Sequence, residues 1–452
     1  MKKVFIETLG CSKNLNDSEI MLGILDDHYT LCEDVSEAEV VIVNTCSFIH
    51  DAKEESIETI LELSKLKTNG NCEKLIVTGC LSQRYPETLL EEIPEIDAVI
   101  GTSNFYEIEE VLDVLYDEKN SHHHNKLFMK NVDIEIPEAL PRILTTPSHY
   151  AYLKIAEGCD NKCTYCIIPK LRGKYRSRKI EDIVEEAQDL ASMGIKELMI
   201  IAQDTSRYGI DIYEEAKLDV LLAELSKIEG IKWIRVHYSY PDILDDRLLD
   251  GFFNNEKVVN YFDIPVQHAS DNILKLMNRR TSLKDIEAII SKIRSRDPRA
   301  VIRTTVIVGF PGETQADFDI LMNFVEKVRF DRLGAFEYSF EEDTPSAKLP
   351  NHLSDEIKKE RRELLMEKQM IISESLSYEK IGSVYEVVIE EVAEAGKILV
   401  GRTAFDAPDI DGVVYVHTAL PIEFGTFVNV KITDALEYDL IGVIENEDEY
   451  RK

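Results

Sequence analysis

Apolar runs and amphipathic stretches alternate along most of the chain. In the N-terminal third, short apolar runs predict strands at residues 3–9, 40–45, 74–79 and 98–103. Stretches with the periodicity of amphipathic helices lie between and after them, at residues 51–64, 86–93 and 105–116. Because alternating strands and helices build parallel sheets, this part of the chain predicts a parallel α/β sheet domain.

The alternation continues in the centre of the chain. Apolar runs predict strands at residues 151–157, 197–204, 233–239, 261–268, 302–309 and 332–339. Helical patterns separate them, at residues 180–193, 218–228, 271–277, 283–294 and 315–328. Such strand–helix units predict a partial (β/α)6 barrel of the TIM type, in which reactive groups lie on the loops after the strands.

The period changes after a charged helical stretch at residues 357–377. Short alternating runs follow at residues 384–389, 397–403, 413–417, 427–432 and 440–444, with glycines between them, which predicts a small antiparallel β-barrel. We therefore expect an α/β protein with an N-terminal domain (1–117), a linker (118–147), a barrel core (148–376) and a C-terminal β-barrel (377–446). The linker contains His122, His123 and His124, which we expect to be solvated because no other ligand pattern surrounds them.

Composition narrows the class of protein. No apolar run approaches the roughly 20 residues that a membrane helix needs, and Glu7 interrupts the place of a signal-peptide core, so we expect a cytoplasmic protein. The formal net charge of −33 repels phosphate backbones and attracts basic partners. From residue 377 onward there are sixteen Asp and Glu against six Lys and Arg. Nucleic acid is therefore disfavoured as a direct substrate, although a local basic patch could still bind RNA.

Cys159, Cys163 and Cys166, here called the barrel-loop trio, form a C-x3-C-x2-C motif after the first predicted barrel strand. Patterned thiols in a reducing compartment indicate metal ligands before disulfides. Three thiolates on one short loop can hold three irons of a 4Fe-4S cubane and leave the fourth iron open to a chelating small molecule. Zinc is the alternative, but it prefers four closed ligands, and no second Cys pair or His follows at the usual distance.

Cys11, Cys46 and Cys80, here called the strand-end trio, follow the first three predicted strands. Their separations of 35 and 34 residues each match about one strand–helix–strand unit. Because the carboxyl ends of parallel strands meet at one edge of a sheet, the trio predicts a second cluster with a free iron site. The alternative is that cysteine is simply a common small buried residue at strand ends. Cys32 and Cys72 lack this placement, and we expect ordinary thiols there.

Other predicted strand ends of the barrel carry candidate cofactor contacts. We expect them at Gln203, at Arg303 and in the turn that contains Gly309, Pro311 and Gly312, where glycine lets the backbone approach a ligand. A turn without a ligand is the alternative. His268 is either a proton handler or a core histidine. The basic run after the barrel-loop trio either binds a carboxylate or is solvated; it comprises Lys170, Arg172, Lys174, Arg176, Arg178 and Lys179.

These motifs resemble the methylthiotransferase family of radical S-adenosylmethionine (SAM) enzymes over essentially the whole chain. The most specific matches are to the branch that modifies an aspartate of small-subunit ribosomal protein S-twelve, at residues 10–15, 17–19, 44–49, 52–56, 202–205, 401–403, 406–412 and 437–440. The tRNA-modifying branch usually has an arginine shortly after the second cysteine, whereas this chain has Phe48, Ile49 and His50 there.

The resemblance implies two 4Fe-4S clusters and S-adenosyl-L-methionine as cofactors. It implies that the barrel-loop trio binds the cluster that splits SAM into methionine and a 5′-deoxyadenosyl radical, which removes a hydrogen from the β-carbon of the target aspartate. The strand-end trio would bind the cluster that holds the inserted sulfur, and a second SAM would supply the methyl group. Partners would be the basic ribosomal protein, an electron donor and a sulfur source, and the C-terminal barrel would be a TRAM domain. The alternatives are a tRNA adenosine methylthiotransferase and a zinc-bearing binding protein without catalysis.

Overall fold

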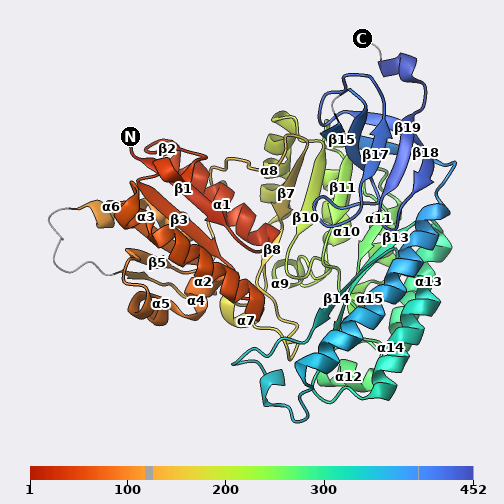
Figure 1. Ribbon diagram of the computed structural model, residues 1–452, viewed down its shortest axis with the longest axis horizontal. Coiled ribbons are helices and arrows are strands. Elements are labelled where there is room, and N and C mark those ends of the chain that lie inside the picture. Colours follow the sequence, from red (N-terminus) through yellow and green to blue (C-terminus); the bar gives the residue numbers. More distant parts are fainter. Residues whose placement is uncertain (118–125, 395, 451–452) are drawn as a thin grey trace.

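The computed structural model describes residues 1–117, 126–394 and 396–450. The predicted linker histidines, residues 122–124, lie outside the described residues. Figure 1 shows an N-terminal α/β domain in red and orange, a central half-open barrel in yellow to cyan, and a C-terminal β-barrel in blue. Within the described ranges, none of the helices combines the length and the apolar character that a membrane span requires.

The N-terminal domain is a six-stranded sheet with the order β2-β1-β3-β4-β5-β6, in which neighbouring strands pair in parallel. Its strands are β1 (Lys3–Thr8), β2 (Thr30–Leu31), β3 (Val40–Thr45), β4 (Lys74–Gly79), β5 (Ala98–Ile100) and β6 (Leu127–Phe128). Its helices are α1 (Ser12–Leu25), α2 (His50–Ser64), α3 (Leu66–Asn69), α4 (Cys80–Arg84), α5 (Pro86–Glu92) and α6 (Ile108–Tyr116). The predicted parallel sheet is confirmed. Strand β6 lies in the segment expected to be a linker and is too short to show periodicity.

The central domain contains two parallel three-stranded sheets with the orders β11-β10-β7 and β12-β13-β14. A parallel bridge from Ile234 to Val258 connects them. The strands are β7 (Tyr150–Lys154), β10 (Glu197–Ile201), β11 (Trp233–Val236), β12 (Tyr261–Asp263), β13 (Val301–Val308) and β14 (Arg332–Glu337), with a small hairpin of β8 (Ala156–Glu157) and β9 (Arg176–Ser177). These six parallel strands confirm the predicted partial barrel.

Helices cover the convex side of this barrel, as Figure 1 shows. The helices of the central domain are α7 (Ile168–Leu171), which lies against α4, α8 (Ile180–Ser192), α9 (Ile210–Tyr213), α10 (Leu218–Leu225), α11 (Asp246–Phe253), α12 (Asp271–Leu276), α13 (Leu283–Arg296), α14 (Gln315–Val328) and α15 (Asp355–Tyr378). Helices α13 and α14 begin with reciprocal capping boxes, Ser282 with Asp285 and Thr314 with Asp317, which satisfy backbone donors that a helix leaves free at its start.

The C-terminal domain is a closed five-stranded barrel with the order β15-β16-β17-β19-β18. Its strands are β15 (Val384–Glu394), β16 (Ile398–Thr403), β17 (Val414–His417), β18 (Phe427–Ala435) and β19 (Leu440–Ile444). The predicted small barrel is confirmed, with one difference. Strands β17 and β19 pair in parallel, whereas the prediction gave an antiparallel barrel. Strand direction at this closure depends on contacts between distant segments, which the alternation of residues does not encode.

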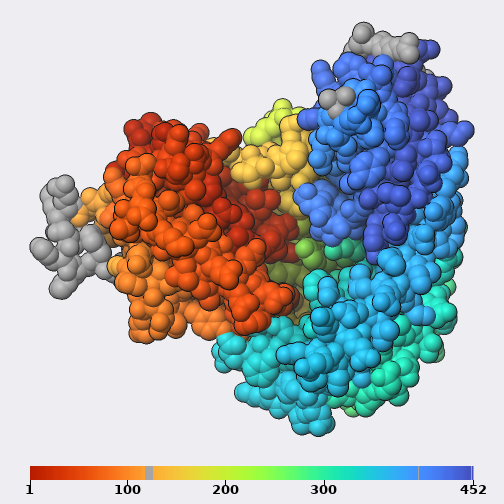
Figure 2. Space-filling model, in the orientation of Figure 1, coloured from red at the N-terminus to blue at the C-terminus, as the bar shows by residue number. Residues whose placement is uncertain are grey.

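The C-terminal barrel docks on the first residues of the central strands. Arg402 of β16 lies 2.5 Å from Glu197 Oε2 at the start of β10, and both side chains are almost fully buried. Trp233, at the start of β11, packs edge-on against Phe427 with 4.7 Å between ring centroids. The opposite ends of the central strands face the N-terminal domain. Figure 2 shows a hollow in the surface between the N-terminal domain and the C-terminal barrel.

We expect Arg402→Met to lower the free energy of unfolding by about 3 kcal/mol, because the Glu197 carboxylate would lose a buried partner. The single tryptophan, Trp233, lies at this interface, so its fluorescence during urea unfolding measures the effect. Arg299→Met is the control, since that side chain is 81% exposed, and it should change the same quantity by less than about 0.5 kcal/mol. Equal losses in the two variants would show that the Arg402 contact does not stabilise the docking.

Candidate functional site

The strand-end trio lies at one edge of the N-terminal sheet. Cys11 directly precedes α1, Cys46 directly follows β3, and Cys80 is the first residue of α4, directly after β4. The three strands are neighbours in the order β1-β3-β4, so their carboxyl ends bring the three thiols to the same place. This is the convergence that the spacing predicted.

Two glycines allow this convergence. Gly10 has φ +88°, and a Cβ there would lie 2.7 Å from Cys46 Cβ and 3.0 Å from Cys46 Sγ. Gly79 has φ +92°, and a Cβ there would lie 2.5 Å from the carbonyl oxygen of Thr45. Any other residue at either position would be strained and would push the backbone around Cys46 away. The glycine before Cys11 and the glycine before Cys80 therefore hold the trio together.

The thiols of the strand-end trio lie close enough to affect one another's pKa. Burial raises the pKa of Cys46, with a further contribution from Cys11. Burial raises the pKa of Cys80 to about 12, and the neighbouring thiols of Cys11 and Cys46 add to this shift, while the Arg172 guanidinium opposes it. Thiolates in such a place need a positive partner, which a bound metal centre would supply.

The barrel-loop trio lies between β8 and α7, on the loop that follows the first barrel strand. Gly158 has φ +81°, and a Cβ there would lie 2.0 Å from the carbonyl oxygen of Lys174, so the turn into Cys159 requires glycine. Burial raises the pKa of Cys159 to about 12, and the nearby Cys163 thiol adds to the shift. Cys163 Sγ also lies 2.8 Å from the Tyr240 hydroxyl. These contacts gather the three thiols on one short, largely buried loop.

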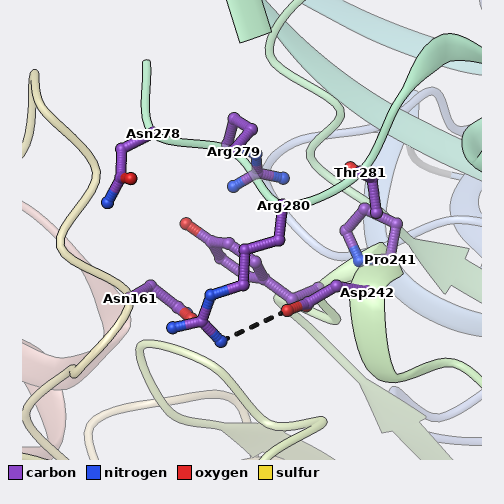
Figure 3. A pocket seen from close by; sticks show the side chains of 8 residues that line it. Asn161, Pro241, Asp242, Asn278, Arg279, Arg280 and Thr281 are labelled. Carbon is purple, nitrogen blue, oxygen red and sulfur yellow. Dashed lines mark hydrogen bonds and ion pairs between the residues drawn. The ribbon is translucent and has the colours of Figure 1, made fainter. Parts of the chain in front are cut away.

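A shallow hollow, too small for more than about one water molecule, adjoins the loop of the barrel-loop trio. Figure 3 shows Asn161 of the cysteine loop on one side of it and the segment from Asn278 to Thr281 on the other. Arg279 stacks its guanidinium 4.0 Å above the Tyr240 ring, and its Nη1 lies 4.0 Å from Cys163 Sγ. Arg280 lies 3.4 Å from Asp242. The surroundings of Cys163 are therefore polar and cationic.

A buried ion network connects the two trios. Asp17, on the helix that starts at Cys11, accepts hydrogen bonds from Lys154 Nζ and Arg172 Nη1, both at 2.6 Å. The same two cations lie 3.1 and 3.2 Å from Glu157 Oε2, and Glu157 stands two residues before Cys159. Burial alone would raise the pKa of Glu157, but Lys154 and Arg172 hold it well below its usual range. We call these four residues the interdomain network; it fixes both trios at one domain interface.

The N-terminal domain also contacts the last strand of the barrel. Glu341, in the loop after β14, lies 2.8 Å from Lys53 Nζ and 2.7 Å from Arg84 Nη1. The His50 amide donates to the Ser339 hydroxyl at 3.3 Å. Since the interdomain network holds the domain at the first strand, the N-terminal domain spans the mouth of the half-open barrel from its first strand to its last.

The residues predicted to contact the cofactor have other partners within the chain, and Arg303 lies near the start of β13 rather than at its carboxyl end. Gln203 Nε2 donates to Glu157 Oε1 at 2.6 Å, and Arg303 lies 3.6 Å from Asp263. A Cβ on Gly309 would lie 2.4 Å from Lys358 Cγ, so packing on α15 by itself accounts for this glycine. Pro311 is buried in the same turn, and Gly312 has φ +86°. Cofactor contact at these five positions remains a prediction.

Two residue sets whose roles the sequence left open now have definite surroundings. His268 is fully buried, accepts a hydrogen bond from the Ser270 amide at Nδ1 and lies 3.6 Å from Glu313, which places it in the core behind the glycine turn.

Most residues of the basic run pair with acidic residues of the chain; Arg178, for example, pairs with Glu138 and Glu186. Arg172 is the member that reaches the cysteines.

Sequence reasoning missed Tyr240 and Arg279. Tyr240 directly follows a predicted strand end and could have been found by that rule. Arg279 lies in a loop after α12 and carried no such signal.

Among the described residues, no group of three or more His, Cys, Asp or Glu surrounds the position of a single metal ion. A cubane places each thiolate on a different iron, so its ligands do not surround one ion.

Comparison with known proteins agrees with the three domains. Residues 3–101 match the family described as uncharacterized protein family UPF0004, residues 153–325 match the radical SAM superfamily, and residues 381–444 match the TRAM domain. Among solved structures, the radical SAM methyltransferase TsrM from Kitasatospora setae, with cobalamin and a [4Fe-4S] cluster bound, aligns with a TM-score of 0.57 over 76% of this chain and 77% of that chain. At 14% identity this likeness shows the fold alone.

Two relatives align along nearly the full length. A protein named ribosomal protein uS12 methylthiotransferase RimO, from Clostridioides difficile (strain 630), is 55% identical over 443 residues, which cover 98% of each chain. A protein of the same name from Acetivibrio thermocellus is 51% identical over 449 residues, which cover 99% of each chain. With this identity along its whole length, the chain belongs to the RimO family of radical SAM methylthiotransferases.

Proposed function

We propose that this protein adds a methylthio group to the β-carbon of an aspartate in ribosomal protein uS12 of the small subunit. The observation that carries the proposal is the convergence of the two cysteine trios at one interface, which the interdomain network joins. Replacement of an unactivated C–H bond needs a site that generates a radical and a site that delivers sulfur, and two clusters facing one space meet that need. The names of the full-length relatives support uS12 as the substrate.

The cysteines fit two 4Fe-4S clusters, one on each trio. Each trio offers three thiols within electrostatic range of one another in a mostly buried place. When bound, the clusters and SAM supply the radical and the sulfur chemistry. The chain itself would position the clusters and exclude water from them. Gly10 and Gly79 bring one trio together, and Gly158 allows the turn of the loop that carries the other. The N-terminal domain covers the barrel mouth and so keeps water out.

We further propose that SAM lies between the barrel-loop trio and the neighbouring strand ends. Gln203 follows β10, the strand next to β7, whereas Arg303 and the turn with Gly309, Pro311 and Gly312 belong to β13 and the loop after it, in the other central sheet. Arg303 supplies a cation on β13, although Asp263 already neutralises part of its charge. Tyr240 and Arg279 contact Cys163 directly and would border the same ligand.

The charge of the chain supports a basic protein substrate. A net charge of −33 raises the encounter rate with a basic partner and opposes the approach of tRNA. The proposed reaction additionally requires a one-electron donor and a sulfur source, and a ribosomal protein substrate supports a cytoplasmic location. We retain 1–117, 148–376 and 377–446 as the proposed domains and 118–147 as the linker between the first two, which contributes strand β6 to the N-terminal sheet.

We expect the purified protein with both clusters, given SAM, a reductant and sulfide, to increase the mass of uS12 by one methylthio group. The uS12 should come from cells that lack this gene, so that the target is unmodified at the start. Mass spectrometry of the digested product then locates the modified aspartate. Modification of tRNA with uS12 left unchanged would overturn the proposal in favour of a tRNA enzyme.

Cys46→Ala and Cys163→Ala should each lose about half of the bound iron, because each variant breaks one of two clusters. The cluster that remains in Cys46→Ala should change its electron paramagnetic resonance spectrum when SAM is added, and the one that remains in Cys163→Ala should not. Cys72→Ala is the matched control, because Cys72 is buried but belongs to neither trio. Full iron content in either trio variant, or loss in the control, would contradict the assignment of ligands.

A further inference from the structure

Lys13 is a buried cation without a counter-ion. Its side chain lies on α1, two residues after Cys11, and the residue is only 7% exposed. No hydrogen bond or ion pair joins its ammonium group to any part of the chain that the structure describes. Its one polar contact is with the ring of Tyr238, 3.3 Å below Lys13 Nζ, in the loop after β11.

The other buried lysines show that this is unusual for the protein. Of the three lysines that are buried in the described ranges, Lys154 lies 2.6 Å from Asp17, and Lys358 lies 2.9 Å from Asp355. The chain has 85 acidic residues, so carboxylates are plentiful. A cation–π contact compensates only part of the lost hydration of an ammonium group. The position of Lys13 therefore calls for an anion that the chain itself does not provide.

The groups around Lys13 do not supply the missing anion either. Helix α1 has no acidic residue in its first turn and no side chain that caps its start, so the positive end of the helix at the strand-end trio is also left without an anion. Asp263 accepts a hydrogen bond from the Tyr238 amide at 3.0 Å, and it also lies 3.6 Å from Arg303 and 3.4 Å from His237. Asp263 is therefore already neutralised by other groups and is not the counter-ion of Lys13.

Lys13 lies at the interface between the N-terminal domain and the central barrel. Figure 1 shows α1 on the face of the N-terminal domain that is turned toward the central barrel. Lys13 starts beside the strand-end trio and ends on Tyr238 at the barrel mouth, so its ammonium group bridges the two sides of the interface. Figure 2 shows a hollow in the surface between the N-terminal domain and the C-terminal barrel, on the side of the N-terminal domain that faces the rest of the chain.

We propose that Lys13 binds the carboxylate of a ligand in the barrel mouth. Resting on the function proposed above, this carboxylate belongs either to the target aspartate of uS12 or to SAM. The two sources share one chemistry, and both must lie between the trios during the reaction. If the carboxylate is that of the target aspartate, Lys13 determines specificity, because a neutral side chain or a base would leave the cation unpaired.

The test measures dissociation constants of the protein with both clusters loaded. The ligands are SAM, uS12, and uS12 with asparagine at the target position. The enzyme variants are Lys13→Met, which removes the charge at similar volume, Lys13→Arg, which keeps it, and Lys65→Met as an exposed lysine control on the same domain. Iron content and melting temperature show whether each variant is folded and loaded.

If the target aspartate is the ligand, the native enzyme binds uS12 about tenfold more tightly than its asparagine form, and Lys13→Met abolishes that preference. If SAM is the ligand, Lys13→Met weakens SAM binding about tenfold and keeps the preference for aspartate. Lys13→Arg should stay within about threefold of the native enzyme in either case. The asparagine comparison needs no enzyme variant and stands even if Lys13→Met does not fold.

Unchanged binding of both ligands in a folded, loaded Lys13→Met protein would overturn the proposal for Lys13 and leave the proposed function intact. Failure of the native enzyme to bind or modify uS12 would overturn the proposed function instead. In that case the SAM measurement alone decides whether Lys13 binds a carboxylate.

Discussion

The buried network of Asp17, Lys154, Glu157 and Arg172 is the constraint on which the rest of the structure depends. Two carboxylates and two cations balance one another out of contact with water, and each cation lies against both carboxylates. Removal of one member would leave an uncompensated charge at the domain interface. Because Asp17 follows Cys11 on α1 and Glu157 precedes Cys159, the geometry of this network also sets the geometry between the two trios.

The N-terminal and C-terminal domains pack on opposite ends of the central strands. The central strands have two ends: the C-terminal barrel packs on the starts of β10 and β11, and the N-terminal domain covers the loops at the other end. Reactive groups in such barrels lie at the carboxyl ends of the strands, so the chain stabilises one end and builds its chemistry at the other. The acidic C-terminal barrel flanks the open side, where a basic substrate would approach.

Much of this arrangement could be predicted from the sequence, because it depends on local signals. The six cysteines of the two trios stand at strand ends or in a tight motif, and alternation along the chain predicts the sheet, the half-open barrel and the small barrel. Other features depend on contacts between distant segments. Strand β6 has two residues and no periodicity, the parallel pairing of β17 with β19 closes a barrel across the chain, and the meeting of Lys13 with Tyr238 joins residues of different domains. Gly10 and Gly79 were a local signal for the strand-end trio that the spacing argument did not use.

The central claim is that two clusters face one space between the domains. Electron paramagnetic resonance of the fully loaded protein, with both clusters reduced, tests it most directly. The account predicts magnetic coupling between the clusters, seen as broadened lines and faster relaxation than in Cys46→Ala or Cys163→Ala, each of which retains one cluster. A spectrum equal to the sum of those of the two single-cluster variants would contradict it.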